Sequence, residues 1–79
     1  MKFSYDLRYD IAYIRFMDKP QQVESIKVSE ELVMDVAPDG TVSGIELLNA
    51  NEQLRAGDDG ALVVVNEAIG DRREIRLIG

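Results

Sequence analysis

The amino-acid sequence predicts an α+β fold that is mostly β: an antiparallel sheet of five to seven strands, built from hairpins, with one short helix. Three features indicate this class. Apolar and polar residues alternate near the N-terminus, β-branched residues recur in short runs, and turn-forming residues separate these runs. A chain of 79 residues holds one small domain, so we expect residues 1–79 to fold together.

The first hairpin is predicted from side-chain parity. Phe3, Tyr5 and Leu7 alternate with polar residues, which is typical of a half-buried strand. The run Ile11–Met17 has β-branched and aromatic residues on both parities, so we expect a central strand covered on both faces. Between them, residues 6–10 begin and end with aspartate, which favours a short turn.

The middle of the chain is predicted to be a loop and two strands. Asp18–Gln22 is polar and contains a proline, so it is predicted to be a loop. Val23–Val28 follows as a weak or edge strand. Ser29 with the two glutamates after it is a possible helix start, but the composition from Glu31 to Ala37 favours a strand.

After a further strand up to Leu48, the segment Asn49–Gly57 is the best helix candidate. Asn49 or Asn51 would cap it and Gly57 would end it. A final hairpin is predicted from the strands Ala61–Ile69 and Arg73–Ile78 joined by a Gly70–Asp71 turn.

The run Leu62–Val65 is apolar on both faces of its predicted strand. An apolar strand left on an open edge promotes aggregation, so these residues need a cover. The cover is either the short helix or the same surface of a second copy. We therefore expect a homodimer.

Composition excludes several classes of function. The chain has no Cys and no His, so it lacks disulfides, thiol nucleophiles, imidazole bases and the usual zinc ligands. A net charge of −6 argues against nucleic-acid binding and suits a basic protein partner. No segment has the length and apolarity of a signal peptide or membrane span, so we expect no membrane association and a cytoplasmic protein.

The segment from Asp35 to Glu46 comes within one residue of the calcium-loop pattern D-x-[DN]-x-[DN]-G-x5-E. Asp35, Asp39 and Gly40 take the first, fifth and sixth positions, but Ala37 stands where the third-position ligand belongs. The flanking residues have strand composition, whereas a calcium loop lies between helices. We therefore predict a hairpin, with a divalent-cation site of Asp35, Asp39 and Glu46 as the alternative.

Residues 38–40, Pro-Asp-Gly, fit a three-residue hairpin loop in which the glycine takes the left-handed conformation. Continued without interruption, this register pairs Asp35 with Ser43 and Leu32 with Glu46. It therefore predicts that the carboxylates of Asp35 and Glu46 point to opposite faces of the sheet and cannot bind one cation.

Two further charged groups are candidates for chemistry. Asp6 and Asp10 are candidates for the acid–base pair of a small hydrolase. No His or nucleophile accompanies them, so a structural role in the turn is favoured. The positive cluster of Arg72, Arg73 and Arg76 alternates with acidic residues. We interpret it as a solvated, self-paired strand.

Two stretches, YDLRYDIAYIRF and VMDVAPDGTVSGIELLNA, resemble the small prokaryotic domain-of-unknown-function family numbered 2283. The resemblance covers residues 1–50, and residues 51–79 are an additional helix and hairpin. The chain departs from the family's more acidic pattern at Ala37-Pro38, which weakens a metal role. The matching residues are Asp6, Asp10, Tyr13, Ile14, Asp35, Asp39, Gly40, Gly44, Ile45, Glu46 and Leu48.

The resemblance implies a bacterial, sheet-based module with no established activity. Some members are encoded beside small toxin-like proteins, which implies a neutralising partner role. Together with the composition, this predicts a non-catalytic protein–protein interaction or self-association module, without catalytic, cofactor-binding or metal-binding residues. The cation-binding module and the carboxylate-dependent hydrolase are the alternatives.

Overall fold

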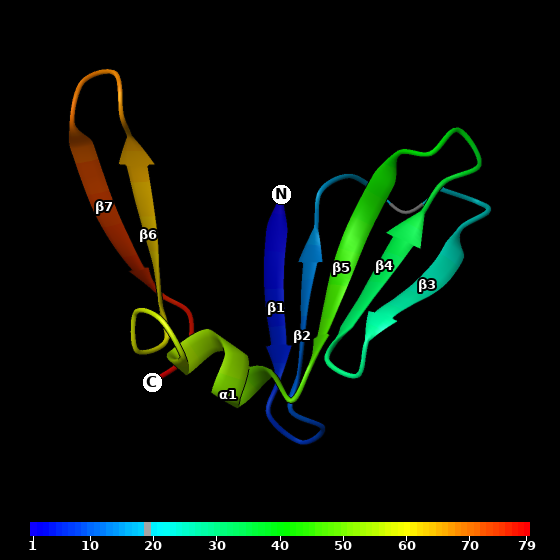
Figure 1. The fold of residues 1–79 in the computed structure, drawn as a ribbon, viewed down its shortest axis with the longest axis horizontal. Coiled ribbons are helices and arrows are strands. Elements are labelled where there is room, and N and C mark those ends of the chain that lie inside the picture. The colour runs from blue at the N-terminus through cyan, green and yellow to red at the C-terminus, as the bar shows by residue number, and fades with distance from the viewer. Residues whose placement is uncertain (19) are drawn as a thin grey trace.

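The structure is a computed structural model that describes residues 1–18 and 20–79. The described part of the chain contains seven strands and one short helix (Figure 1), which confirms the predicted mostly β, α+β class. In chain order the elements are β1 (Lys2–Asp6), β2 (Ile11–Arg15), β3 (Glu24–Ser29), β4 (Leu32–Val36), β5 (Val42–Leu48), α1 (Ala50–Arg55), β6 (Ala61–Asn66) and β7 (Asp71–Arg76).

The first five strands form one antiparallel sheet with the order β1-β2-β5-β4-β3. The predicted first hairpin is confirmed. As predicted, β2 is an internal strand, but it is not covered on both faces, because Tyr13 and Arg15 line an open hollow. It ends at Arg15, and Phe16 and Met17 beyond it are exposed. The predicted loop from Asp18 to Gln22 contains no strand or helix in its described residues, and Lys19 lies outside them.

One face of this sheet is apolar across all five strands. The register places Phe3 opposite Ile14, Ile14 opposite Ile45, Ile45 opposite Met34, and Met34 opposite Ile26. Paired residues lie on the same face, so these five side chains form a row that crosses the sheet. A second, parallel row contains Tyr5, Ala12, Leu47 and Leu32.

The turn between β4 and β5 has the predicted three-residue loop. The Ala37 and Gly40 amides donate to the carbonyls of Thr41 and Ala37, at 2.8 and 2.9 Å, and Gly40 has a φ of +90°. A left-handed dihedral of this kind is accessible to glycine at little cost. The local chemistry of the sequence was sufficient to predict this turn.

The register predicted beyond the turn is wrong because a β-bulge interrupts it. Val36 pairs with Val42, but Asp35 pairs with Gly44, so Ser43 is the extra residue. Ser43 is 1% exposed, and its hydroxyl donates to the Asp35 carbonyl at 3.3 Å. One inserted residue reverses the facing of every residue beyond it. Asp35 and Glu46 therefore lie on the same face of the sheet.

The helix α1 is shorter than predicted and is capped differently. It ends at Arg55, two residues before Gly57. Asn49 occupies the N-cap position with a φ of 54°, and its side chain makes no capping hydrogen bond. Its amide donates instead to the Glu52 carboxylate at 2.9 Å. Asn51 lies inside the helix, so neither asparagine side chain caps it.

The last two strands form a separate two-stranded sheet. The turn begins three residues earlier than predicted, at Glu67, since β6 ends at Asn66 and Asp71 is already in β7. In Figure 1 the β6–β7 hairpin stands apart from the larger sheet, and α1 connects the two. The cover expected for this hairpin is absent in the single chain, where Leu62, Val64 and Val65 are 40%, 46% and 51% exposed.

The single chain is extended and has a small core. Its accessible surface is 5808 Å², roughly 1,000 Å² more than the roughly 4,800 Å² expected for a folded monomer of 8.9 kDa. The radius of gyration of 14.0 Å likewise exceeds the roughly 11.6 Å expected for 79 residues. In the described part of the chain, the buried apolar residues are Ala12, Ala50 and Ile78. No helix among residues 1–18 and 20–79 is long and apolar enough to cross a membrane.

Candidate functional site

The polar face of the five-stranded sheet carries a cluster centred on Asp35. The Tyr13 hydroxyl on β2 and the Ser25 hydroxyl on β3 donate to its two carboxylate oxygens, each at 2.7 Å. Cross-strand pairing brings these groups together, because Asp35 pairs with both Ser25 and Gly44. The two hydroxyls fix the orientation of the Asp35 carboxylate and link side chains from β2, β3 and β4.

Gly44 leaves the space in which the Tyr13 ring lies. A Cβ atom at this position would come within 2.2 Å of the Tyr13 hydroxyl oxygen and 2.5 Å of the adjoining ring carbon. Any larger residue at position 44 would therefore push the ring away from Asp35. The glycine is explained by the tyrosine that crosses over it.

Glu46 and Arg15 complete the polar cluster. Glu46 pairs with Tyr13 on one side and Val33 on the other, and Arg15 pairs with Gly44. The cluster lines an open, shallow hollow on the polar face. Chemically, it presents two carboxylates, two hydroxyls and one guanidinium to the solvent, which suits hydrogen bonding to a polar surface.

The half-buried position of Tyr13 and its bond to Asp35 raise the pKa of this tyrosine from 10.0 to about 12. Burial is the largest cause, and it disfavours the charged phenolate. The folded protein holds the proton more tightly than the unfolded chain. The stabilisation is thus fully present below pH 10 and declines as the pH rises through about 12.

We therefore expect the free energy of unfolding to fall between pH 10 and pH 12, because the unfolded chain loses the Tyr13 proton first. Denaturant titrations across this range, with absorbance at 295 nm to follow phenolate formation, measure it. Tyr13→Phe is the control, since it has no proton to lose. If the difference in stability between the wild type and Tyr13→Phe is the same at pH 9 and pH 12, the prediction is wrong.

A second cluster, at the opposite end of β2, is centred on Asp10. Its carboxylate accepts hydrogen bonds from the Tyr5 hydroxyl and from the backbone amide of Asn51, both at 2.8 Å. Its backbone carbonyl accepts a hydrogen bond from the backbone amide of Ala50 at 3.0 Å. Asp10 thereby supplies the N-terminal cap that Asn49 does not supply. Its bond to Tyr5 is the largest cause of the raised pKa of that tyrosine.

The structure separates the residues of the two alternative sites. Asp39 lies at the tip of the β4–β5 turn, where its carboxylate accepts the Thr41 amide at 2.9 Å, a bond that holds its pKa below the usual range. Asp35 and Glu46 lie on the polar face of the sheet. Among residues 1–18 and 20–79, no three His, Cys, Asp or Glu side chains gather as a metal site requires.

Asp6 and Asp10 likewise have different partners. The Asp6 carboxylate accepts the backbone amide and the guanidinium of Arg8 at 2.9 and 3.1 Å, and the Arg8 side chain is the main reason that its pKa is lowered. This is the turn role predicted for it. Asp10 binds Tyr5 and Asn51 instead.

The arginine cluster on β7 is paired largely as predicted. Arg72 forms an ion pair with Glu74 at 3.0 Å, and Arg73 with Asp71 at 3.5 Å. The Arg76 guanidinium donates to the carbonyl of Asp59.

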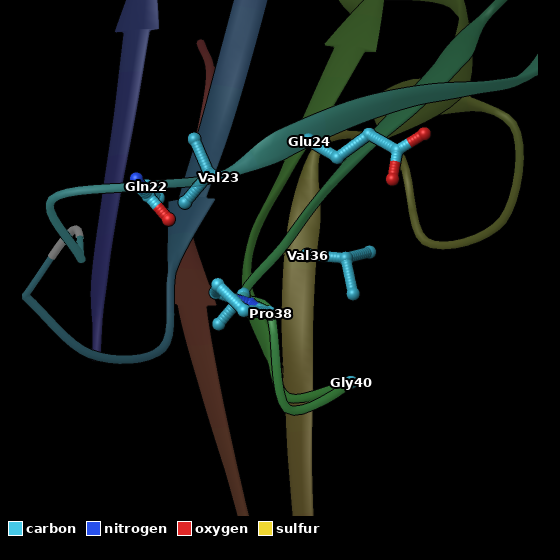
Figure 2. Close-up of a pocket in the computed structure, with 7 residues that line it drawn as sticks. Gln22, Val23, Glu24, Val36, Pro38 and Gly40 are labelled. Atoms are coloured by element: carbon cyan, nitrogen blue, oxygen red, sulfur yellow. The ribbon is translucent and has the colours of Figure 1, made fainter.

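A further open hollow lies where the apolar face ends, beside the β4–β5 turn. Figure 2 shows Val36, Pro38 and Gly40 on one side of this hollow and Gln22, Val23 and Glu24 on the other. Val36 pairs with Val42 and shares its face with Met34, so the hollow continues the apolar face towards the chain reversal. It contains one ionisable side chain, Glu24, and offers no convergent polar groups.

Sequence reasoning identified the acids of these clusters but not their partners. Asp10, Tyr13, Asp35 and Gly44 were all among the residues that carry the family resemblance. Their joint presence was the available signal for the two clusters. Ser25 gave no signal, because a serine on an exposed edge strand has no distinctive pattern.

The comparisons with known proteins give one match. A family model described as a protein of unknown function (DUF2283) matches residues 2–51. The matched segment runs from β1 to the first turn of α1, so it contains both clusters, and the β6–β7 hairpin lies beyond it. No curated protein and no solved structure matches the chain.

Proposed function

The chain belongs to the DUF2283 family of proteins of unknown function, and on this premise we propose that it is a cytoplasmic, non-catalytic module that associates with a second copy of itself through the apolar face of its sheet. The observation that carries the proposal is the uncovered row of apolar side chains across all five strands. An antiparallel sheet commonly has one face in a core and one in solvent. In the described part of the chain, the short helix α1 contacts β2, where Ala12 is buried, and the β6–β7 hairpin stands apart from the sheet.

The amount of exposed surface supports association. The row ends at Ile26 on the β3 edge, which is 41% exposed, and the other four members are only half-buried. The excess over a compact monomer is roughly 1,000 Å², which is close to the roughly 800 Å² that each partner buries in a standard interface. Burying this area in a dimer would bring each chain to the exposure of an ordinary folded protein.

The polar face is unsuited to the same role. Its central groups are the Asp35 carboxylate, the Glu46 carboxylate and the Arg15 guanidinium, which are expensive to remove from water without matched partners. An interface between two identical copies of this face would bring carboxylates together. We therefore assign the self-association to the apolar face.

Self-association is tested by sedimentation equilibrium from micromolar to millimolar concentration, where a dimer of the 8.9 kDa chain is expected. Ile26→Glu places a charge on the apolar face. We therefore expect the dissociation constant of the dimer to rise at least about tenfold, which corresponds to about 1.4 kcal/mol. Ser4→Glu is the matched control, because it adds the same charge to the other edge strand on the polar face. A wild type that stays monomeric, or equal effects of the two substitutions, would contradict the proposal.

A further inference from the structure

We propose that the β6–β7 hairpin is an exchanged arm: in the dimer, the hairpin of each copy packs on the apolar face of the five-stranded sheet of the other copy. The inference rests on the proposed self-association and specifies which two surfaces meet. It commits to a second copy of this chain as the occupant of the face. The following observations carry it.

Apart from the contacts at its base, the hairpin has no strand partner within residues 1–18 and 20–79. Its strands pair only with each other, and Figure 1 shows them away from the larger sheet. An isolated two-stranded hairpin is marginally stable at best in water. Its ordered strands therefore need another layer, and its exposed apolar residues show where that layer would bind.

One face of the hairpin is better suited to docking than the other. Leu62 pairs with Ile75 on the first face, and these two side chains are 40% and 51% exposed. Val64, 46% exposed, lies beside them on the same face, opposite Arg73, so this face has one apolar pair whereas the other has none. On the second face every apolar residue of β6 is paired with a charged residue of β7, namely Arg76, Glu74 and Arg72. The first face is the docking face.

The base of the hairpin is fixed to α1, which holds the arm away from its own sheet. The Gly60 amide donates to the Leu54 carbonyl at 2.9 Å, and the Gly60 carbonyl accepts the amides of Leu77 and Ile78 at 2.9 and 3.2 Å. Ile78 is 7% exposed, one of the few buried apolar side chains. Folding the arm back onto its own sheet would have to change the Gly60–Leu54 contact with α1, whereas docking on a second copy preserves it.

The two surfaces match in length. Each strand of the hairpin has 6 residues, or about 20 Å at about 3.3 Å per residue. β4 and β5, at the centre of the apolar face, have 5 and 7 residues. A hairpin laid along these strands would therefore cover the members of both apolar rows that lie on β4 and β5.

The charges are compatible with this arrangement. Residues 1–49 contain nine acidic and five basic residues, which gives a net charge of −4. Residues 61–79 contain three of each, so the arm is neutral. Docking an arm on the acidic half of a second copy adds little repulsion, whereas stacking the two acidic sheets adds more. The exchange also satisfies two-fold symmetry, because each copy gives one arm and receives one.

The test uses cysteine pairs, which is straightforward because the natural chain has no cysteine. Val64→Cys is placed on the docking face of the arm, and Met34→Cys at the centre of the apolar face of the sheet. The two variants are mixed, allowed to exchange subunits and oxidised. We expect the monomer to be lost to a disulfide-linked species that contains one copy of each variant, identified by intact mass.

Two matched controls locate the contact. Val65→Cys lies on the other face of the hairpin, and Ser4→Cys on the polar face of the sheet. Val65→Cys mixed with Met34→Cys, and Val64→Cys mixed with Ser4→Cys, are both expected to stay largely unlinked. Circular dichroism of each variant before oxidation confirms that it is folded.

The alternative outcomes have distinct meanings. If Met34→Cys links mainly to itself, the sheets pack on each other, and the exchange is wrong while self-association stands. If the double variant Val64→Cys/Met34→Cys forms an internal disulfide at the 8.9 kDa mass, the arm folds on its own sheet and the exchange is also wrong. A wild type that is monomeric at every concentration overturns both the exchange and the proposed function.

Discussion

Asp10→Ala is expected to lower the free energy of unfolding by about 2–3 kcal/mol, because one side chain holds three parts of the fold together. The carboxylate accepts hydrogen bonds from Tyr5 on β1 and from the Asn51 amide in α1. Removing it leaves the first turn of the helix without a cap. The backbone adds to the cost, since Asp10 has a φ of 54°, a left-handed conformation that aspartate tolerates better than alanine.

Two matched substitutions separate these contributions. Asp10→Asn keeps the carbonyl oxygen that accepts both bonds and tolerates the same dihedral, so we expect a loss below about 1 kcal/mol. Asp10→Gly removes the dihedral cost but also both bonds, so its effect is expected to lie between the other two. Chemical denaturation of the four proteins measures the order. An alanine variant as stable as the asparagine variant would show that Asp10 does not cap α1.

The same substitutions bear on the position of the arm. α1 is the connection between the five-stranded sheet and the hairpin, and its first turn is held to the sheet through Asp10. If α1 frayed, the orientation of the hairpin relative to the five-stranded sheet would no longer be fixed. A weaker dimer in Asp10→Ala, alongside its lower stability, is thus the expected consequence for the exchanged arm.

The sequence was most informative where the structure depends on neighbouring residues. The alternation in β1, the Asp6 turn and the loop at residues 38–40 all follow from local chemistry, and each was predicted. The turn type could be predicted because proline, aspartate and glycine each have narrow backbone preferences. The family resemblance also pointed to the residues of the two clusters.

The failures share the opposite cause, which is dependence on distant residues. Asp10 caps a helix that begins 40 positions later, so Asn49 was the natural but wrong candidate. The strand glycine at position 44 is a general sign of a bulge or a close approach, but the place of the bulge depends on the burial of Ser43 and on the Asp35 carbonyl. This one inserted residue was enough to place Asp35 and Glu46 on the same face of the sheet and not on opposite faces.

Gly44→Ala is the second substitution with a large expected effect, a loss of about 2 kcal/mol in the free energy of unfolding. The new methyl would lie 2.2 Å from the Tyr13 hydroxyl oxygen, so the ring must rotate away and lose its bond to Asp35. The backbone itself is not the obstacle, because Gly44 is not among the residues with a positive φ. The predicted loss therefore comes from the displaced tyrosine.

A double-mutant cycle with Tyr13→Ser tests that attribution. With the ring removed, Gly44→Ala has no clash, and replacing a strand glycine is then expected to be neutral or to stabilise by about 0.5–1 kcal/mol. Absorbance titration gives an independent check, since a displaced Tyr13 should lose the burial and the Asp35 bond that raise its pKa to about 12. An equal loss with and without the Tyr13 ring would mean that position 44 is restricted by the bulge at Ser43 and not by the tyrosine.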